Sequence, residues 1–183
     1  MSEFQNKYRI ESNRLKEFAY TEAWWYYITI CVKGHQKIFG EISNGNVKLS
    51  DIGKMIREEW IKTKLIRPNI DLDEFVIMPN HIHGIIIIDF VETTGPVVSE
   101  SYANNEMTHR VISTTLSKNS LGSIIGQFKS VCTKRIRKMG YLNFAWQSNY
   151  YDHIIRNQTD LDRIRKYIQL NLLKWELDEY YSE

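Results

Sequence analysis

Two histidines separated by one residue, His81 and His83, are the sharpest chemical signal in this sequence. They begin an isoleucine-rich segment, 81–90, whose composition predicts a β-strand buried on both faces. Side chains at positions i and i+2 of a strand point to the same face of the sheet, so the two imidazoles would stand side by side. Imidazole is the commonest metal-ligating side chain, but a stable metal site needs at least a third protein ligand. The spacing therefore fits a metal site and also fits two hydrogen-bonded structural histidines.

A second pair, Tyr167 and Asn171, lies near the carboxyl end of the sequence. Residues four apart share one face of a helix, and these two flank the apolar stripe that includes Ile164 and Ile168. A phenol and an amide at the edge of a buried face could together address a metal-bound phosphate. Ordinary packing is the alternative, because the chain contains 11 Tyr.

Basic residues gather in the segment 107–151, which has seven Lys and Arg residues and no Asp or Glu. The whole chain carries a net charge of only +2, so the remainder is acidic. Such asymmetry suggests a polyanionic partner for this segment, with a merely solvated basic face as the alternative. If that partner is a nucleic acid, the residues expected to contact its phosphates are Lys129, Lys134, Arg135, Arg137, Lys138 and, from the N-terminal segment, Arg14.

The composition is that of a folded globular protein, with 43% hydrophobic residues, 25% charged residues and only 3 Pro in 183 residues. It excludes a mostly disordered chain and a fibrous repeat. The 2 Cys are too few for a disulfide framework, so we expect a reduced, cytoplasmic protein. The longest apolar run, 85–88, is too short to cross a bilayer, and no membrane partner is expected.

The apolar pattern predicts the elements that must hold these residues in place. Aromatic and β-branched runs indicate strands at 24–32, 72–78, 81–90 and 150–156. Helical periodicity indicates helices at about 50–64 and 120–139, and a third whose N-cap is Thr159 or Asp160. Asn44-Gly45 predicts a hairpin turn between the first strand and the first helix. This mixed order favours an α+β fold in which helices cover one face of an antiparallel sheet.

We expect the chain to form a single domain over residues 1–183. Three segments should lie outside its core: a basic N-terminal arm at about 1–20, a flexible insertion at about 91–117 and an acidic tail at about 174–183. The insertion is polar and lacks any clear period, and a loop of this length is either functional or disordered.

Several motifs together resemble one family. The segment FVIMPNHIHGIIII, 75–88, resembles the signature strand pair of the single-tyrosine HUH transposases of insertion sequences, in which U is a hydrophobic residue. The segments IIGQFKSVCTKRIRK, FAWQSNYYDHIIRN and YIQLNLLKW resemble, more narrowly, the REP-associated tyrosine transposases, where REP stands for repetitive extragenic palindrome. The resemblance runs from about Arg14 to Trp175.

The resemblance implies a ferredoxin-like or RRM-like antiparallel sheet with both histidines on a central strand. It also implies that Tyr167 is the nucleophile and that Asn171 is the third ligand, beside His81 and His83, of a divalent metal ion, Mg²⁺ or Mn²⁺. The implied activity is transposition by cleavage and rejoining of hairpin-bearing single-stranded DNA through a 5′-phosphotyrosine. One position departs from the family, which commonly has Pro where this chain has Leu172.

Alternatives remain open at this point. A non-catalytic or domesticated nucleic-acid-binding protein could use the same fold, and a structural or toxin-like metal-binding domain is a more distant reading. Tyr150 and Tyr151 are rival nucleophiles, and His153 fits a supporting or structural role better than that of a ligand. Both a homodimer and a monomer are compatible with the family.

Overall fold

The computed structural model describes residues 24–43, 45–89, 120–177 and 181, together with the backbone of two short strands, β1 (Glu3–Phe4) and β2 (Lys7–Tyr8). Arg14 and the insertion expected at 91–117 lie outside the described residues. Among the residues described, no helix is long and apolar enough to cross a bilayer.

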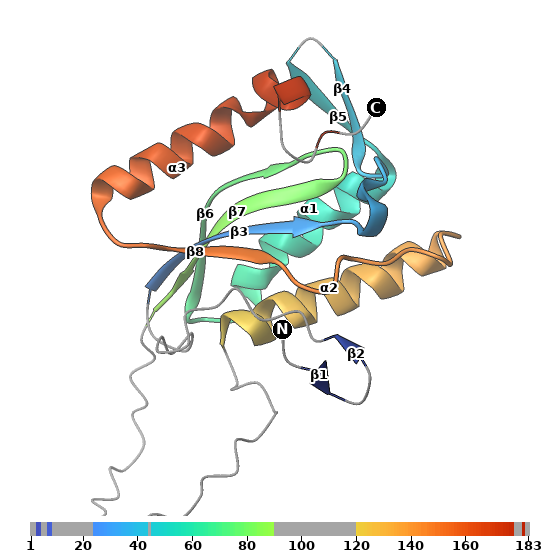
Figure 1. Ribbon diagram of the computed structural model, residues 1–183, viewed down its shortest axis with the longest axis horizontal. Helices are drawn as coiled ribbons and strands as arrows, with labels where there is room; N and C mark the ends of the chain where they lie inside the picture. Colours follow the sequence, from blue (N-terminus) through green and yellow to red (C-terminus); the bar gives the residue numbers. More distant parts are fainter. Residues whose placement is uncertain are drawn as a thin grey trace, which may run out of the picture.

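The centre of the fold is a four-stranded antiparallel sheet with the strand order β6-β7-β3-β8 (Figure 1). Its strands are β3 (Trp24–Cys31), β6 (Ile70–Ile77), β7 (His81–Ile88) and β8 (Tyr151–Ile155). With a helix after the first and third of these strands, the topology is that of a ferredoxin-like fold. The central strands β3 and β7 pair along their whole length, and Thr29 lies directly opposite His83.

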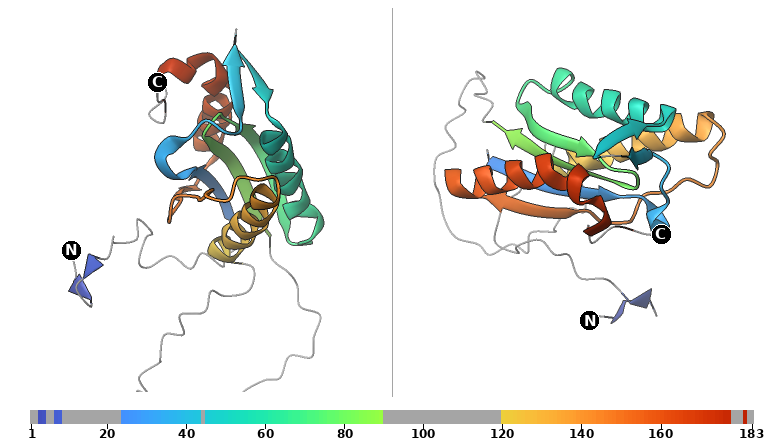
Figure 2. Two further views of the ribbon diagram at one scale, coloured as in Figure 1. Left: turned by 90° about the vertical axis from the view of Figure 1, so that its right-hand side faces the viewer. Right: turned by 90° about the horizontal axis from the view of Figure 1, so that it is seen from above.

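Helices cover both faces of this sheet (Figure 2). On one face, α1 (Asp51–Leu65) and α2 (Leu121–Lys138) pack against the even-numbered residues of β3 and β7, such as Ile28 and Ile82. On the other face, α3 (Gln158–Asn171) packs against odd-numbered residues, such as Tyr27 and Ile85.

The α+β class and the antiparallel sheet predicted from the sequence are confirmed. The expectation that helices lie on one face holds for α1 and α2 but not for α3. The physical reason is that β3 and β7 carry apolar side chains on both faces, so each face must be covered by another layer.

Side-chain caps fix where the helices begin. Ser50 accepts a hydrogen bond from the backbone N–H of Gly53 at 3.0 Å, and Ser120 caps α2 in the same way. The predicted N-cap of α3, Thr159 or Asp160, is wrong by two or three residues, because the N-cap is Asn157. Asn157 has an extended backbone and accepts a hydrogen bond from the Asp160 N–H at 2.9 Å, because an Asn side chain at this position satisfies an otherwise unpaired helical donor.

Three shorter elements complete the described chain. The predicted hairpin forms from β4 (Gly40–Ser43) and β5 (Asn46–Leu49), with Gly45 at a positive φ of 71° in the turn. A 3₁₀ turn, η1 (Lys33–His35), follows β3. The start of the expected acidic tail lies in a second 3₁₀ segment, η2 (Leu172–Leu177), whose Trp175 is buried near His81, with ring centroids 6.0 Å apart.

Gly84 on β7 yields a prediction about packing. A Cβ at this position would lie 2.6 Å from Cζ2 of the fully buried Trp60 and 3.3 Å from Cβ of Phe75. We expect Gly84→Ala to lower the free energy of unfolding by about 1–3 kcal/mol, because an overpacked core must shift rigid side chains.

Urea unfolding measures this effect, and Gly126→Ala is the matched control. Gly126 lies within α2 and a Cβ there would meet nothing within 4 Å, so alanine should stabilise the fold by roughly 0.5–1 kcal/mol. A Gly84→Ala variant as stable as the parent protein would show that the Trp60 packing is wrong.

Candidate active site

The two histidines of β7 converge on the face of the sheet that α3 covers. Nε2 of His81 lies 2.9 Å from Nε2 of His83, and the ring centroids are 4.4 Å apart. Both side chains are 0% exposed. Their shared face agrees with the two-residue spacing on a strand.

The other ring nitrogen of His81 is held by the turn that precedes β7. Nδ1 lies 2.7 Å from Oδ1 of Asn80, while Nδ2 of Asn80 donates to the backbone carbonyl of His35 at 3.2 Å. This second bond orients the amide with its oxygen toward His81, so Nδ1 must carry the hydrogen and donate it. In a neutral ring Nε2 then carries the lone pair, which is the form that binds metal ions.

The outer nitrogen of His83 is held by the neighbouring strand. Nδ1 lies 2.8 Å from the Tyr27 hydroxyl and 2.9 Å from the Thr29 hydroxyl, both on β3. The ring of Tyr27 also stacks on that of His83, with centroids 5.7 Å apart. We call His81, His83, Asn80, Tyr27 and Thr29 the histidine cluster; it is a buried polar network within an apolar layer.

Helix α3 carries the two other predicted site residues and brings Tyr167 into contact with this cluster. The Tyr167 hydroxyl lies 3.5 Å from Nε2 of His83, and the two ring centroids are 5.3 Å apart. Asn171 follows one helical turn later and is 3% exposed, whereas Tyr167 is 43% exposed. The phenol therefore touches both the buried histidine cluster and solvent.

An open pocket of about 670 Å³ lies between α3 and the edge strand β8. Tyr27, Thr29, Tyr167 and Asn171 line it, but neither His81 nor His83 does. The rest of the lining includes the cationic side chains of Arg163, Lys166 and Lys174, the rings of Tyr151 and His153, and the apolar Ile164, Leu170 and Leu177. An anionic ligand in this pocket would reach the Tyr167 hydroxyl and find positive charge around it.

A carboxylate that contacts two residues of the pocket lining, His153 and Arg163, fixes the start of α3 to β8. Asp160 contacts Nε2 of His153 at 2.7 Å and Nη2 of Arg163 at 2.6 Å. Burial alone would raise the pKa of the Asp160 carboxyl, but the hydrogen bonds from Arg163 and His153 outweigh it and hold that pKa below its usual value. His153 thus has the structural contact that the sequence favoured over a ligand role.

The spacing of the two imidazole nitrogens in the histidine cluster fits a divalent cation bound to both of them. Two nitrogens bound at about 2.1 Å and 90° apart on one ion would be separated by about 3.0 Å, close to the 2.9 Å between the two Nε2 atoms. In the described part of the chain, no three His, Cys, Asp or Glu side chains are grouped so as to hold a metal ion. A third protein ligand would therefore be of another type, and the amide of Asn171 on the facing helix has suitable chemistry.

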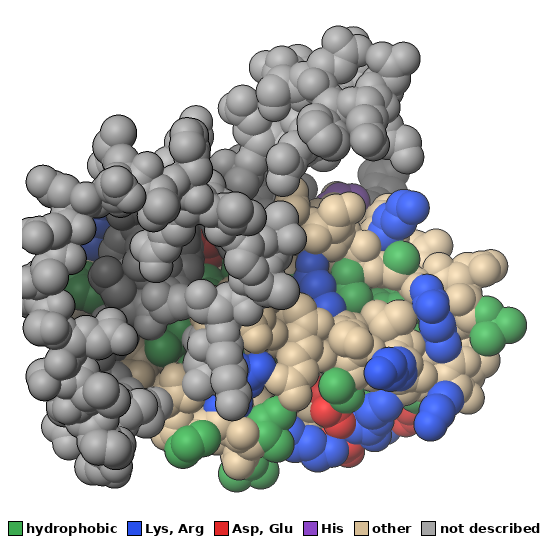
Figure 3. Space-filling view, turned by 90° about the horizontal axis from the view of Figure 1, so that it is seen from below, with side chains coloured by type: hydrophobic (Ala, Val, Ile, Leu, Met, Phe, Trp, Pro, Cys, Tyr) green, Lys and Arg blue, Asp and Glu red, His purple; other side chains and the backbone are tan. Residues whose placement is uncertain are grey.

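All the basic residues predicted to contact DNA except Arg14 lie on α2, which packs on the opposite face of the sheet from the histidine cluster. Figure 3 looks at this side and shows exposed Lys and Arg side chains, with a few Asp and Glu among them, where grey atoms do not cover the surface. Arg135 pairs with Glu58 and Glu59 of α1. Lys134 and Lys138 are exposed.

Lys129 and Arg137 are engaged with the segment that leads to β8. The Lys129 ammonium donates to the carbonyls of Gln147 at 2.8 Å and Asn149 at 2.9 Å, and Arg137 donates to the carbonyl of Phe144 at 3.3 Å. Lys129 therefore has a structural role that its sequence context did not reveal.

Sequence reasoning also missed the partners of the histidines. Asn80, Tyr27 and Thr29 hold the imidazoles in place, yet the sequence motifs assign none of them to the site. The signal available was a threonine inside an apolar strand, because a buried hydroxyl requires a hydrogen-bond partner. Of the rival nucleophiles, Tyr151 lines the same pocket as Tyr167, whereas Tyr150 packs near the Lys129 ammonium.

Comparison with known proteins identifies a relative of this chain. The chain is 35% identical over 176 residues to an uncharacterized protein of Haemophilus influenzae, a match that covers 94% of this chain and 93% of the relative. The two belong to one family. No family model matches the chain.

A solved structure shows which fold this family has. The REP-associated tyrosine transposase bound to a REP hairpin matches 93% of this chain and 77% of its own, with a TM-score of 0.58 and 19% sequence identity. The chain thus has the fold of a REP-associated tyrosine transposase, and the resemblance drawn from the sequence motifs is confirmed at the level of the fold.

Lys129 yields a prediction about pH. Burial lowers the pKa of the Lys129 ammonium, the nearby Cys31 raises it by a smaller amount, and the resulting pKa is about 8. An unfolded lysine titrates at about 10.4. Between these values the unfolded chain binds a proton that the folded chain has lost, so the contribution of Lys129 to stability rises with pH across this window.

A ¹³C NMR titration of lysine Cε checks this, with the Lys129 resonance assigned by its disappearance in Lys129→Arg. We expect a midpoint near 8 for this resonance. A midpoint of about 10 or above would mean that the two carbonyl contacts keep the ammonium charged and would contradict the prediction.

Proposed function

We propose that this protein is a metal-dependent tyrosine transposase that cuts and rejoins single-stranded DNA bearing hairpins, such as REP-like palindromes. The observation that carries the proposal is the 3.5 Å contact between the Tyr167 hydroxyl and His83 Nε2, because it joins a phenol on α3 to paired imidazoles on β7. The transposase fold and the REP hairpin bound by the solved relative support DNA as the substrate class.

In this proposal His81, His83 and the amide of Asn171 hold the cation, Mg²⁺ or Mn²⁺. The cation would supply positive charge to a non-bridging oxygen of the scissile phosphate. Two imidazole ligands suit Mn²⁺ better than Mg²⁺, which prefers oxygen. Asn80, Tyr27 and Thr29 orient the two rings through their outer nitrogens, which is the usual task of groups behind a metal ligand.

Tyr167 is the nucleophile of the proposed reaction. Its hydroxyl oxygen attacks the phosphorus, the new P–O bond forms as the bond to the 3′ oxygen breaks, and the 3′ oxygen takes up a proton. The product is a 5′-phosphotyrosine and a free 3′-hydroxyl. One phosphodiester replaces another, so rejoining needs no external source of energy. Nε2 of His83 can bind either the phenolic proton or the cation, and another group must therefore accept that proton when the cation is bound.

The pocket beside Tyr167 supports a single-stranded substrate. Its cationic residues Lys166 and Lys174 can neutralise phosphates, while the exposed ring of Tyr151 on the edge strand offers a surface for stacking a base. A flexible strand can present a phosphate to the tyrosine in such a pocket more easily than a duplex, whose phosphates lie on a rigid cylinder.

We retain the proposal that α2 contacts DNA, but with fewer residues than the sequence predicted. Lys134 and Lys138 are exposed and can address phosphates, whereas Lys129, Arg135 and Arg137 are engaged within the fold. Because α2 lies across the sheet from Tyr167, its lysines would contact a part of the DNA distant from the cleaved bond. They would therefore contribute to affinity and not to the chemical step.

A non-catalytic or domesticated nucleic-acid-binding protein on the same fold is the second candidate. It is favoured by the complete burial of both imidazoles, because a 2.9 Å contact between two Nε2 atoms also fits one ring donating a hydrogen bond to the other. In this case the histidine cluster would only stabilise the docking of α3. The two candidates differ in whether DNA becomes covalently attached.

The decisive variant is Tyr167→Phe, which removes one oxygen and keeps the ring that packs on Tyr27. We expect covalent attachment of hairpin-bearing single-stranded DNA in Mn²⁺ to be lost completely, because phenylalanine cannot form the ester. Stability should change by no more than about 1 kcal/mol. A denaturing gel reports the adduct, and a thermal melt of the same samples reports folding.

Tyr151→Phe is the matched control, because it removes the same atom from another tyrosine of the pocket, and it should retain the adduct. An adduct that persists in Tyr167→Phe and disappears in Tyr151→Phe would transfer the role to Tyr151. Wild-type protein that binds this DNA but forms no adduct in Mn²⁺ or Mg²⁺ would favour the non-catalytic candidate.

A further inference from the structure

The edge strand β6 contains an irregularity opposite the centre of β7. Leu72 pairs with Ile86 and Phe75 pairs with Gly84, so two residues, Asp73 and Glu74, lie opposite a single one. This is a β-bulge. Leu72 and Phe75 both pack against the core under α1 and α2, although an odd separation in a regular strand would put them on opposite faces.

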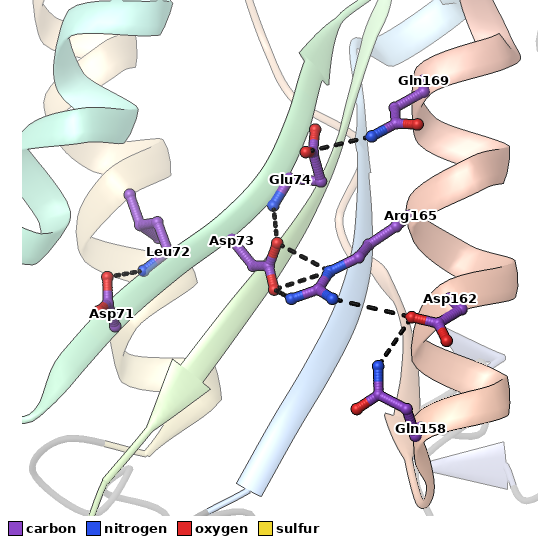
Figure 4. Close-up of polar contacts among 8 residues, drawn as sticks. All are labelled: Asp71, Leu72, Asp73, Glu74, Gln158, Asp162, Arg165 and Gln169. Carbon is purple, nitrogen blue, oxygen red and sulfur yellow. Dashed lines mark hydrogen bonds and ion pairs between the residues drawn. The ribbon is translucent and has the colours of Figure 1, made fainter.

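The bulge leaves two consecutive carboxylates in contact with α3 (Figure 4). Asp73 binds the guanidinium of Arg165 in a bidentate manner, with Nε 3.2 Å from Oδ1 and Nη2 2.5 Å from Oδ2. Glu74 accepts a hydrogen bond from Nε2 of Gln169 at 3.2 Å. Arg165 also lies over the ring of Trp25 on β3, 5.9 Å from its centroid.

These contacts hold the side of α3 that faces away from Tyr167. Arg165 and Gln169 are four residues apart and lie on one face of the helix. Tyr167 is two residues from each, which is about 200° around the helix axis. One side of α3 is thus tied to the edge strand β6, while the opposite side presents Tyr167 to His83 and to the pocket.

Stability alone gives little reason for this arrangement. Three apolar residues of α3 are buried against the sheet and hold the helix there: Leu161, Ile164 and Ile168. Partly exposed ion pairs add little to the free energy of folding; the Asp73 and Arg165 side chains are 14% and 34% exposed. A bidentate pair does, however, fix direction as well as distance. Apolar contacts leave rotation and sliding of the helix less restricted.

We propose that Asp73 and Arg165, assisted by Glu74 and Gln169, form a positioning clasp that sets the rotation and height of α3 over the histidine cluster. Asp73 and Arg165 are positioning residues in this account, and they act on the reaction through Tyr167. The inference rests on the proposed function for its effect on DNA cleavage. Its effect on the helix itself can be measured without DNA.

The test compares Asp73→Asn with Asp162→Asn in the full-length protein. Asp162 also contacts Arg165, at 3.8 Å, but it lies on α3 itself and ties nothing to the sheet. We expect Asp73→Asn to slow adduct formation by about 10- to 100-fold, because a displacement of about 1 Å at a reacting group can cost a factor of about 100. Asp162→Asn should react at nearly the wild-type rate, and DNA affinity should change by less than about twofold in both.

A reversed pair, Asp73→Arg with Arg165→Asp, separates positioning from a general loss of charge. We expect it to recover much of the rate that either single change loses. Equal losses in Asp73→Asn and Asp162→Asn, or a wild-type rate in Asp73→Asn, would overturn the clasp.

Hydrogen exchange of the protein without DNA gives a second measurement, which does not depend on DNA cleavage. Amides of α3 should exchange faster in Asp73→Asn, while those of α1 and α2 should not change. Unchanged exchange in α3 would overturn the clasp whatever the activity. If the wild-type protein forms no adduct but α3 exchange rises as expected, the clasp stands and the proposed reaction fails.

Discussion

The structure depends on the burial of two imidazoles in an otherwise apolar layer between sheet and helix. A polar group in such a place is tolerated only with hydrogen-bond partners, because an unpaired one costs about 1–3 kcal/mol. His81 and His83 obtain theirs from the turn before β7 and from β3, and their inner nitrogens meet each other and Tyr167. This requirement links strand register, turn geometry and the docking of α3, so a change in any one of them disturbs the others.

The same strand supports two different layers because its faces differ. Toward α1 and α2, β7 presents Ile82, Ile86 and a glycine that admits Trp60. Toward α3 it presents the histidines. The bulge in β6 extends this division, since it directs two acidic side chains to the α3 side without removing Leu72 or Phe75 from the core. The residues of the proposed reaction thus lie on one face, and the basic helix α2 packs on the other.

Much of this could be predicted from the sequence, because it follows from local patterns. Alternation along β7 predicted that His81 and His83 share a face, and the i, i+4 spacing placed Tyr167 and Asn171 together on a helix. What local patterns could not give was which layer each helix joins, since that depends on packing between distant segments. The roles of Lys129 and Arg135 were hidden for the same reason: their partners, backbone carbonyls near β8 and glutamates on α1, are remote in sequence or carry no side-chain signal.

The central claim is that the histidine cluster facing Tyr167 is a cation site. Anomalous diffraction from crystals soaked in Mn²⁺ tests it most directly. The account predicts one strong peak within bonding distance of Nε2 of both His81 and His83, on the side that faces α3. Crystals that hold no Mn²⁺ at this position, with the two Nε2 atoms still in direct contact, would contradict it.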